Sequence, residues 1–331
     1  MPPLLKRLPV ALLVALLALA SLWTFGAIFY DGPFPGIGNI ILALLWTGIL
    51  VFAVRRFPKL RSRLLIWLGL FLVVYIPWLS KKPSDHRDWS PEFARTPSAT
   101  IEGDVVTFTN FRNFDYHPDG TAIERWETRS VHLSKLRHMD FFMTYWGSTL
   151  VGHPVFSFDF GDQGHIAFSI ESRREKGEIY GLISSLYKQF ELIYVVAPES
   201  DIMRSRTNFR KGEEVYLYRL HIQETTARLR FSEYLDSINR FHEKPAWYNV
   251  ITSNCTTAVR GQFTTAERNT RDWRIIFNGK LDELINERAI LYNKVSFAEL
   301  KRRSHINPAA QANPAAETFS DVIREGRLGF E

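Results

Sequence analysis

The chain from 151 to 173 reads Val151-Gly-His-Pro-Val-Phe-Ser-Phe-Asp-Phe160, then Gly161-Asp-Gln-Gly164, then His165-Ile-Ala-Phe-Ser-Ile-Glu-Ser-Arg173. In both arms apolar residues alternate with small or polar ones, which is the period of a β-strand. The segment between the arms begins and ends with glycine, as turns favour. We therefore predict a β-hairpin with one aromatic face and one more polar face. The side chains of the apolar face are Phe156, Phe158, Phe160, Ile166, Phe168 and Ile170.

His153 and Glu171 lie on the more polar face of this hairpin. Matching the two apolar faces requires odd-numbered residues to pair with odd-numbered ones. A three-residue loop at 161–163 places His153 directly across from Glu171. A strand register shifted by two residues places the two side chains diagonally. In both registers a carboxylate is within reach of the imidazole, where it orients the ring and stabilises its protonated form. His165 is an alternative base on the same face. Asp159 is an alternative to Glu171 as the carboxylate that orients the imidazole.

A second stretch, Asn249-Val-Ile-Thr-Ser-Asn-Cys-Thr-Thr-Ala-Val-Arg260, holds Cys255, the only cysteine in the chain. A lone cysteine forms no intrachain disulfide, so it is either a buried structural thiol or a reactive one. Ser253 and Asn254 are good N-cap residues for a helix that begins at Cys255. There the unpaired N–H groups and the helix dipole favour thiolate over thiol. Cys255, His153 and Glu171 thus form a candidate set of nucleophile, base and orienting group.

The rest of the chain after residue 100 mixes strand and helix patterns. We expect a surface excursion at 198–211, which is rich in charge, and an extended surface segment at 304–316, which contains two prolines. The pattern predicts an α+β domain with a mainly antiparallel sheet and helices packed beside it. Further strands are expected at 104–110, 123–133, 141–146, 190–197 and 215–222, and helices at 231–241, 281–291 and 319–327.

Three uncharged apolar runs, at about 8–29, 37–54 and 64–80, precede this domain. Each is long enough to cross a hydrocarbon core of about 30 Å as a helix. The loop 55–63 carries five basic residues and the loop 30–36 carries none, which places the N-terminus in the cytoplasm and the C-terminal part outside. We therefore expect a membrane domain at 1–82 and an exported, periplasmic catalytic domain at 83–331, in the inner membrane of a bacterium.

Charge and motif spacing exclude several other functions. The formal net charge of +6 comes from residues 1–85, which hold nine Lys and Arg against two acidic residues, so the exported part is near neutral and nucleic-acid binding is not expected. Paired metal-ligand spacings and a phosphate-binding loop are absent from the sequence, so we expect no metal and no other cofactor. Arg112, Asp115 and Asn254 are candidates to line the site. Alternatively, Arg112 and Asp115 have a structural role, as an ion pair that ties a loop to the sheet.

Seven motifs in the exported part resemble the periplasmic N-terminal domain of the Lnb-type lipoprotein N-acyltransferases. They occur in order over most of 86–331, whereas the three membrane runs lie outside the shared domain. Asn254-Cys-Thr-Thr together with the earlier Gly152-His pair is the most specific part. The motifs are Arg87-Asp-Trp, Arg112-Asn-Phe-Asp-Tyr, Gly152-His-Pro-Val-Phe-Ser-Phe, Ser169-Ile-Glu-Ser-Arg-Arg-Glu, Trp247-Tyr-Asn, Asn254-Cys-Thr-Thr and His305-Ile-Asn-Pro-Ala.

The resemblance implies a circularly permuted papain-like, NlpC/P60-like fold, with Cys255 as nucleophile and His153 as base. The expected activity is a thiol-dependent acyl transfer, in which a membrane phospholipid acylates the cysteine and an amine, such as that of a lipoprotein, accepts the chain. A periplasmic cysteine peptidase or amidase that acts on a peptide is the alternative with the same residues. A non-catalytic membrane scaffold is the second alternative.

Overall fold

The computed structural model describes residues 3–254, 274, 278–288, 290–315 and 317–331. The chain divides into two compact units. Unit 1 comprises 1–84, 179–190 and 247–250, and unit 2 comprises 85–178, 191–246 and 251–331. The chain therefore passes repeatedly from one unit to the other.

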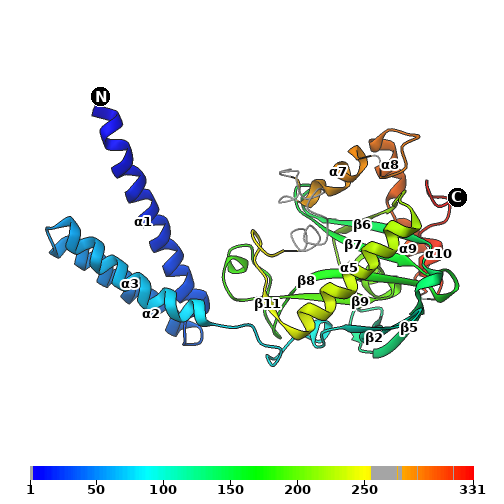
Figure 1. Ribbon diagram of the computed structural model, residues 1–331, viewed down its shortest axis with the longest axis horizontal. Helices are drawn as coiled ribbons and strands as arrows, with labels where there is room; N and C mark the ends of the chain where they lie inside the picture. The colour runs from blue at the N-terminus through cyan, green and yellow to red at the C-terminus, as the bar shows by residue number, and fades with distance from the viewer. Residues whose placement is uncertain (1–2, 255–273, 275–277, 289, 316) are drawn as a thin grey trace. The chain divides into compact units, whose positions relative to one another are not determined.

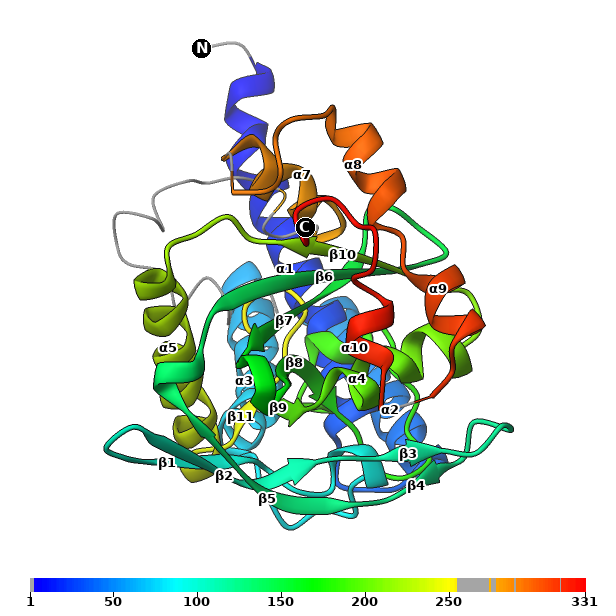
Figure 2. The ribbon, with the colours of Figure 1, turned by 90° about the vertical axis from the view of Figure 1, so that its right-hand side faces the viewer.

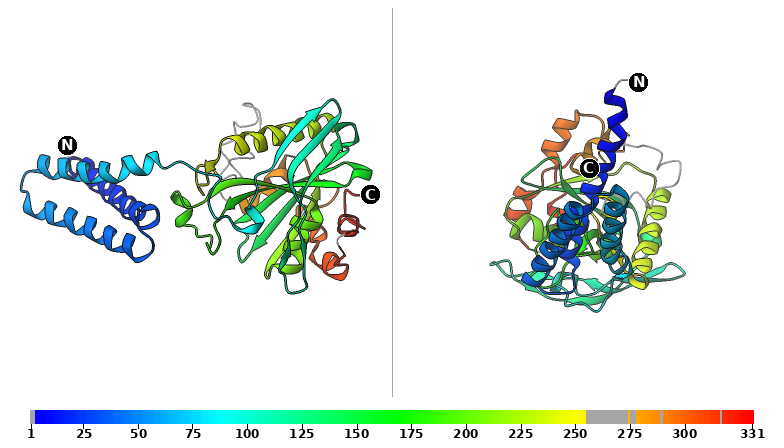
Figure 3. Two further views of the ribbon diagram at one scale, coloured as in Figure 1. Left: turned by 90° about the horizontal axis from the view of Figure 1, so that it is seen from below. Right: turned by 90° about the vertical axis from the view of Figure 1, so that its left-hand side faces the viewer.

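Unit 1 contains the three predicted apolar helices, α1 (Pro3–Asp31), α2 (Ile37–Arg56) and α3 (Leu60–Ser80) (Figure 3). All three are long and apolar enough to span a membrane. The helices contact one another along apolar side chains, and two indole groups add polar links. Trp46 Nε1 donates to the Leu70 carbonyl at 3.1 Å, and Trp67 Nε1 donates to Ser21 Oγ at 2.9 Å. Tryptophan residues thereby satisfy polar groups inside an apolar bundle.

The main sheet of unit 2 follows the predicted antiparallel pattern (Figure 1). Its strand order is β10-β6-β7-β8-β9-β11, and the pairings from β10 to β9 are all antiparallel. The strands are β6 (His138–Trp146), β7 (Gly152–Asp159), β8 (His165–Arg173), β9 (Glu191–Ala197), β10 (Glu213–Arg219) and the two-residue β11 (Ala246–Trp247).

The hairpin formed by β7 and β8 has the register in which odd residues pair with odd residues. Asp159 pairs with His165 and Val155 pairs with Ser169, so the same register carried on toward the strand end brings His153 opposite Glu171. The turn is η3 (Gly161–Gln163), closed by the Phe160 amide, which donates to the Gly164 carbonyl at 2.9 Å. Gly161 and Gly164 both have positive φ, at 60° and 85°, which a side chain would disfavour. The first of the two predicted registers is confirmed.

Both faces of this sheet are covered by helices (Figure 2). The aromatic face of the hairpin packs against α5 (Glu224–Glu243), whose Phe231 ring lies 5.1 Å from Phe158 and 5.9 Å from Phe168. The opposite face packs against α4 (Glu199–Arg204), α9 (Asn307–Ala312) and α10 (Phe319–Val322). The more polar face that carries His153 and Glu171 is therefore an interior face.

The remaining elements surround this core. A three-stranded sheet has the order β1-β2-β5 and joins the α5 side through Phe108, whose ring lies 6.2 Å from that of Phe231. Its strands are β1 (Ser98–Glu102), β2 (Val105–Arg112) and β5 (Trp126–His132). The other elements are β3 (Asp115–Tyr116), β4 (Ala122–Ile123), α7 (Leu281–Glu287), α8 (Phe297–Ser304), η1 (Pro91–Phe93), η2 (Leu133–Lys135), η4 (Ser184–Leu186), η8 (Asn278–Lys280) and the π-helix η5 (Ser205–Phe209).

Two segments expected at the surface are instead packed against the sheet, and both predictions are wrong. The segment 198–211 forms α4 and η5, with Glu199, Asp201 and Arg206 buried, because each of these charges meets an opposite charge from elsewhere in the chain. The segment 304–316 contains α9, in which proline at the second position starts the helix. Its buried Asn307 accepts a hydrogen bond from the Val215 amide at 2.8 Å.

Replacing Phe231 by alanine tests the aromatic core. Phe231 is fully buried, so Phe231→Ala removes a large side chain from a packed site and is expected to lower the free energy of unfolding of unit 2 by about 3–5 kcal/mol. Leu229 on the same helix is 49% exposed, and Leu229→Ala is the matched control, with an expected change within about 0.5 kcal/mol. Near-ultraviolet circular dichroism during denaturant titration measures both. Equal losses for the two variants would contradict this account of the core.

Candidate functional site

The structure brings His153 and Glu171 together at one end of the β7–β8 hairpin. His153 Nε2 lies 3.1 Å from Glu171 Oε1 and 2.7 Å from Ser169 Oγ. The Ser169 hydroxyl in turn donates to Glu171 Oε1 at 2.6 Å. Because the single hydroxyl proton of Ser169 goes to Glu171, Ser169 Oγ can only accept from the imidazole, which requires a proton on His153 Nε2. In the neutral ring the basic nitrogen is then Nδ1.

Arg206, from the π-helix η5, completes this network on the carboxylate side. Its Nη2 lies 2.9 Å from Glu171 Oε1, and its Nη1 lies 2.8 Å from Glu213 Oε2. The guanidinium is almost fully buried, and such planar forks suit carboxylate pairs. π-Helical turns inside helices are rare and often occur at functional sites. Arg206 lies in such a turn and contacts both carboxylates.

The charges of the network shift its pKa values in a consistent direction. Burial alone would raise the pKa of Glu171, but His153 first and then Arg206 hold that pKa well below its ordinary value. Burial would likewise lower the pKa of Arg206, but Glu171 and Glu213 raise it. Glu171 is therefore a carboxylate at neutral pH. It stabilises a positive charge on the imidazole, as a base that must accept a proton requires.

Arg112 and Asp115 each form an ion pair with α4. Arg112 is buried, and its Nε and Nη2 lie 2.9 and 2.7 Å from the two carboxylate oxygens of Asp201. Asp115 pairs with Arg204 instead of Arg112. Asp201 also accepts from the Phe114 amide at 2.8 Å and the Tyr116 hydroxyl at 2.9 Å. These contacts tie Arg112 at the end of β2 and the segment after it to α4, and they differ from the expected ion pair between a loop and the sheet because both partners lie on a helix.

Cys255 lies outside the described residues, and so does the helix expected to begin there. Asn254, directly before it in the chain, is described and is 5% exposed. The role of the cysteine therefore stays a prediction from the sequence.

The rival base His165 lies at the other end of the same hairpin. It pairs in register with Asp159, and its Nε2 is 3.8 Å from Asp159 Oδ1. Asp159 is six residues from His153 along β7, which corresponds to about 20 Å of extended strand. His165 therefore belongs to a different cluster from His153, Ser169 and Glu171.

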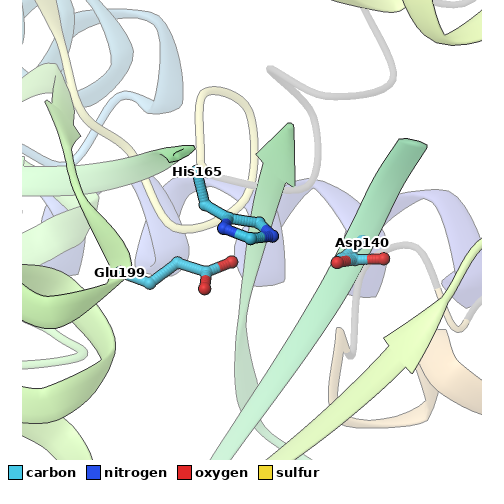
Figure 4. A group of neighbouring side chains, drawn as sticks. All are labelled: Asp140, His165 and Glu199. Carbon is cyan, nitrogen blue, oxygen red and sulfur yellow. The ribbon is translucent and has the colours of Figure 1, made fainter. Parts of the chain in front are cut away.

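The cluster around His165 has the composition of a metal site. Ligand atoms of Asp140, His165 and Glu199 lie within 4.8 Å of one another, and the ring of His165 lies between the two carboxylates (Figure 4). Both carboxylates are already paired with arginine. Arg324 lies 2.7 Å from Asp140 Oδ2 and 2.7 Å from Glu199 Oε1, and Arg219 lies 2.5 Å from Asp140 Oδ1.

These arginine contacts explain the electrostatics of the cluster without a metal ion. Burial would raise the pKa of Glu199, but Arg324 above all lowers it to about 2. A divalent cation would have to displace two guanidinium groups from the same oxygens. The described residues therefore fit a buried ion-pair network that holds α4 and the C-terminal segment to the sheet.

Ser169, Arg206 and Glu213 are members of the site that sequence reasoning missed. Ser169 was visible as a residue on the same strand face as Glu171, two positions away. Arg206 and Glu213 gave no signal, because Arg206 lies in the segment that was expected at the surface. Only the tertiary structure shows that this segment covers the polar face of the hairpin.

One comparison with known proteins identifies the class of this domain. The family model of the Lnb N-terminal periplasmic domain matches residues 122–279. The match spans β7 and β8, the π-helix η5 and the position of Cys255. The resemblance predicted from the motifs is confirmed over these residues: they match an Lnb-type periplasmic domain, and three helices that are long and apolar enough to span a membrane precede them in the chain. No curated protein and no solved structure matches the chain.

Replacing Glu171 by glutamine tests the charge of the network through pH. A carboxylate with a depressed pKa contributes stability above its ordinary pKa of 4.5, and that stability is lost as the pH falls toward the depressed value. The thermal midpoint of the wild type should therefore exceed that of Glu171→Gln at pH 7, and the gap should close as the pH falls below 4.5. Thermal unfolding from pH 7 to pH 3 measures the gap, and a gap that stays constant with pH would refute the assignment.

Proposed function

We propose that this protein is a membrane-anchored cysteine acyltransferase. In this mechanism Cys255 is the nucleophile, His153 is the base and Glu171 orients the imidazole. The observation that carries the proposal is the chain of contacts from the buried His153 through Ser169 and the partly buried Glu171 to the buried Arg206, inside the segment that matches the Lnb N-terminal domain. A carboxylate, a hydroxyl and an arginine arranged in this way prepare an imidazole to accept a proton.

The reaction proceeds in two balanced steps. His153 takes the thiol proton of Cys255, and the thiolate attacks an ester carbonyl of a phospholipid. The C–S bond forms, the ester C–O bond breaks, and the imidazolium returns its proton to the departing lysophospholipid oxygen. An amine then attacks the thioester, loses a proton to His153 and forms an amide, and the thiolate leaves.

The surroundings of the catalytic residues support a lipid donor. Leu150 and Val151 directly precede the strand that carries His153, and Ile251 lies four residues before Cys255. All three side chains are exposed in unit 2. Large apolar side chains exposed near a site are suited to contact with acyl chains. An amine acceptor, such as the N-terminus of a lipoprotein, is also held at the membrane.

The fold and topology complete the proposal. The strand that carries His153 precedes Cys255 in the chain, which is the order expected of a permuted papain-like, NlpC/P60-like domain. The five basic residues of the loop 55–63 support a topology with the N-terminus in the cytoplasm, the three helices in the bacterial inner membrane and the catalytic domain in the periplasm.

A phospholipid with a labelled acyl chain tests the first step. Incubation with the full-length protein should transfer the label to Cys255 through a bond that hydroxylamine cleaves. Cys255→Ser should abolish the thioester, and His153→Ala should slow labelling by about 10²–10⁴-fold, the usual contribution of a general base. Mass spectrometry of the labelled peptide measures the site, and gel fluorescence measures the rate.

His165→Ala is the matched control, because it removes the rival base from the same hairpin and should leave labelling intact. Circular dichroism confirms that each variant is folded. Cleavage of a peptide without acyl labelling would indicate the peptidase or amidase instead. Wild-type complementation by both Cys255→Ser and His153→Ala would leave only the scaffold.

A further inference from the structure

Unit 1 exposes a short apolar loop between β8 and β9. Ile179 is 87% exposed, Leu182 is 65% exposed and Ile183 is 63% exposed. The chain carries no charged residue from 179 to 187. Three large aliphatic side chains in five residues form an apolar patch, and such patches mark contact sites for proteins or membranes.

The residues that follow this loop are fixed to the ends of α1 and α3. The amide of Lys188 donates to Asp31 Oδ2 at 2.9 Å. The ammonium group of Lys188 donates to the carbonyls of Trp78 at 2.6 Å and Lys81 at 2.9 Å, at the C-terminal end of α3. A lysine at that position satisfies carbonyl groups that the helix leaves unpaired.

Further polar and aromatic contacts strengthen this attachment within unit 1. Gln189 Nε2 donates to the Tyr30 carbonyl at 2.8 Å and to Asp31 Oδ1 at 2.9 Å. The ring of Tyr187 stacks on that of Tyr30 at 5.0 Å. Trp78 Nε1 also donates to Asp31 Oδ2 at 2.8 Å, which holds the ends of α1 and α3 at the same level.

The contacts lie at the ends of the membrane-spanning helices, and this position indicates where the loop lies relative to the membrane. The spans end at Asp31 and Ser80, so these residues mark one boundary of the hydrocarbon core. Tyrosine, tryptophan and lysine gather there, as they do at membrane interfaces. The loop is therefore held at the interface, with its aliphatic side chains exposed.

We propose that the loop 179–183 inserts Ile179, Leu182 and Ile183 into the lipid surface on the domain side of the membrane. Its attachment to the ends of two spanning helices favours lipid over a second protein, because every copy of the chain holds the loop at the bilayer. The loop is continuous in the chain with β8, which carries Ser169 and Glu171, and with β9. The loop belongs to unit 1, so lipid contact here is a membrane contact of that unit in addition to its three helices.

Environment-sensitive probes on the full-length protein in lipid nanodiscs test the insertion. Cys255→Ser removes the single native thiol, and Ile179→Cys or Ile183→Cys in that background accepts one nitrobenzoxadiazole label. Both labels should emit at shorter wavelength than in water and should lose most of their intensity when doxyl-labelled phosphatidylcholine replaces the normal lipid. Soluble iodide should quench them weakly.

Ile101→Cys is the matched control, because Ile101 is an isoleucine of unit 2 that is 53% exposed on β1. Its label should be quenched by iodide and not by doxyl lipid. Two outcomes would overturn the proposal: labels at 179 and 183 that respond like the label at 101, or labels that neither quencher reaches, which indicates a protein contact. Because the probes report lipid contact without turnover, the result is independent of the chemistry assigned to Cys255.

Discussion

A single carboxylate oxygen, Oε1 of Glu171, joins the three elements around the candidate site. It lies 3.1 Å from His153 Nε2 on β7, 2.6 Å from Ser169 Oγ on β8 and 2.9 Å from Arg206 Nη2 on η5. A buried carboxylate is costly unless donors surround it. Displacing β7 or η5 from β8 would remove one of these partners from Glu171. The same oxygen therefore determines where the π-helix packs and how the imidazole is turned.

The buried charges of α4 and η5 extend this constraint across unit 2. Asp201 pairs with Arg112, Glu199 pairs with Arg324, and Arg206 pairs with Glu171. Removing one partner of such a pair costs about 3–5 kcal/mol, whereas replacing both by apolar residues is often neutral. These pairs consequently specify which element packs where more than they add net stability. An apolar helix in the same place would cover the sheet without presenting an arginine to Glu171.

The sequence could predict features that depend on neighbouring residues, but it could not predict which buried charges from distant parts of the chain pair with one another. The β7–β8 register was predictable because it depends on local features, the alternation of side chains and the glycines of one turn. The placement of His153 opposite Glu171 followed from that register. The position of 198–211 was not predictable, because the charges of Glu199, Asp201 and Arg206 are visible in the sequence but the partners that the fold brings to them are not. Arg206 was missed for the same reason, whereas Cys255 remains a prediction from the sequence alone.

The physical demands of a lipid substrate distinguish the proposed acyltransferase from a peptidase with the same residues. Withdrawing an acyl chain of about 16 carbons from the bilayer into water costs on the order of 10 kcal/mol, at about 0.8 kcal/mol per methylene. An enzyme for phospholipid esters must therefore meet its substrate at the interface and cover the chain with apolar surface. The exposed Leu150, Val151 and Ile251 supply such surface in unit 2, near His153 and Cys255 in the chain. A peptidase with a soluble substrate has no need of them, and their exposure to water would only promote aggregation.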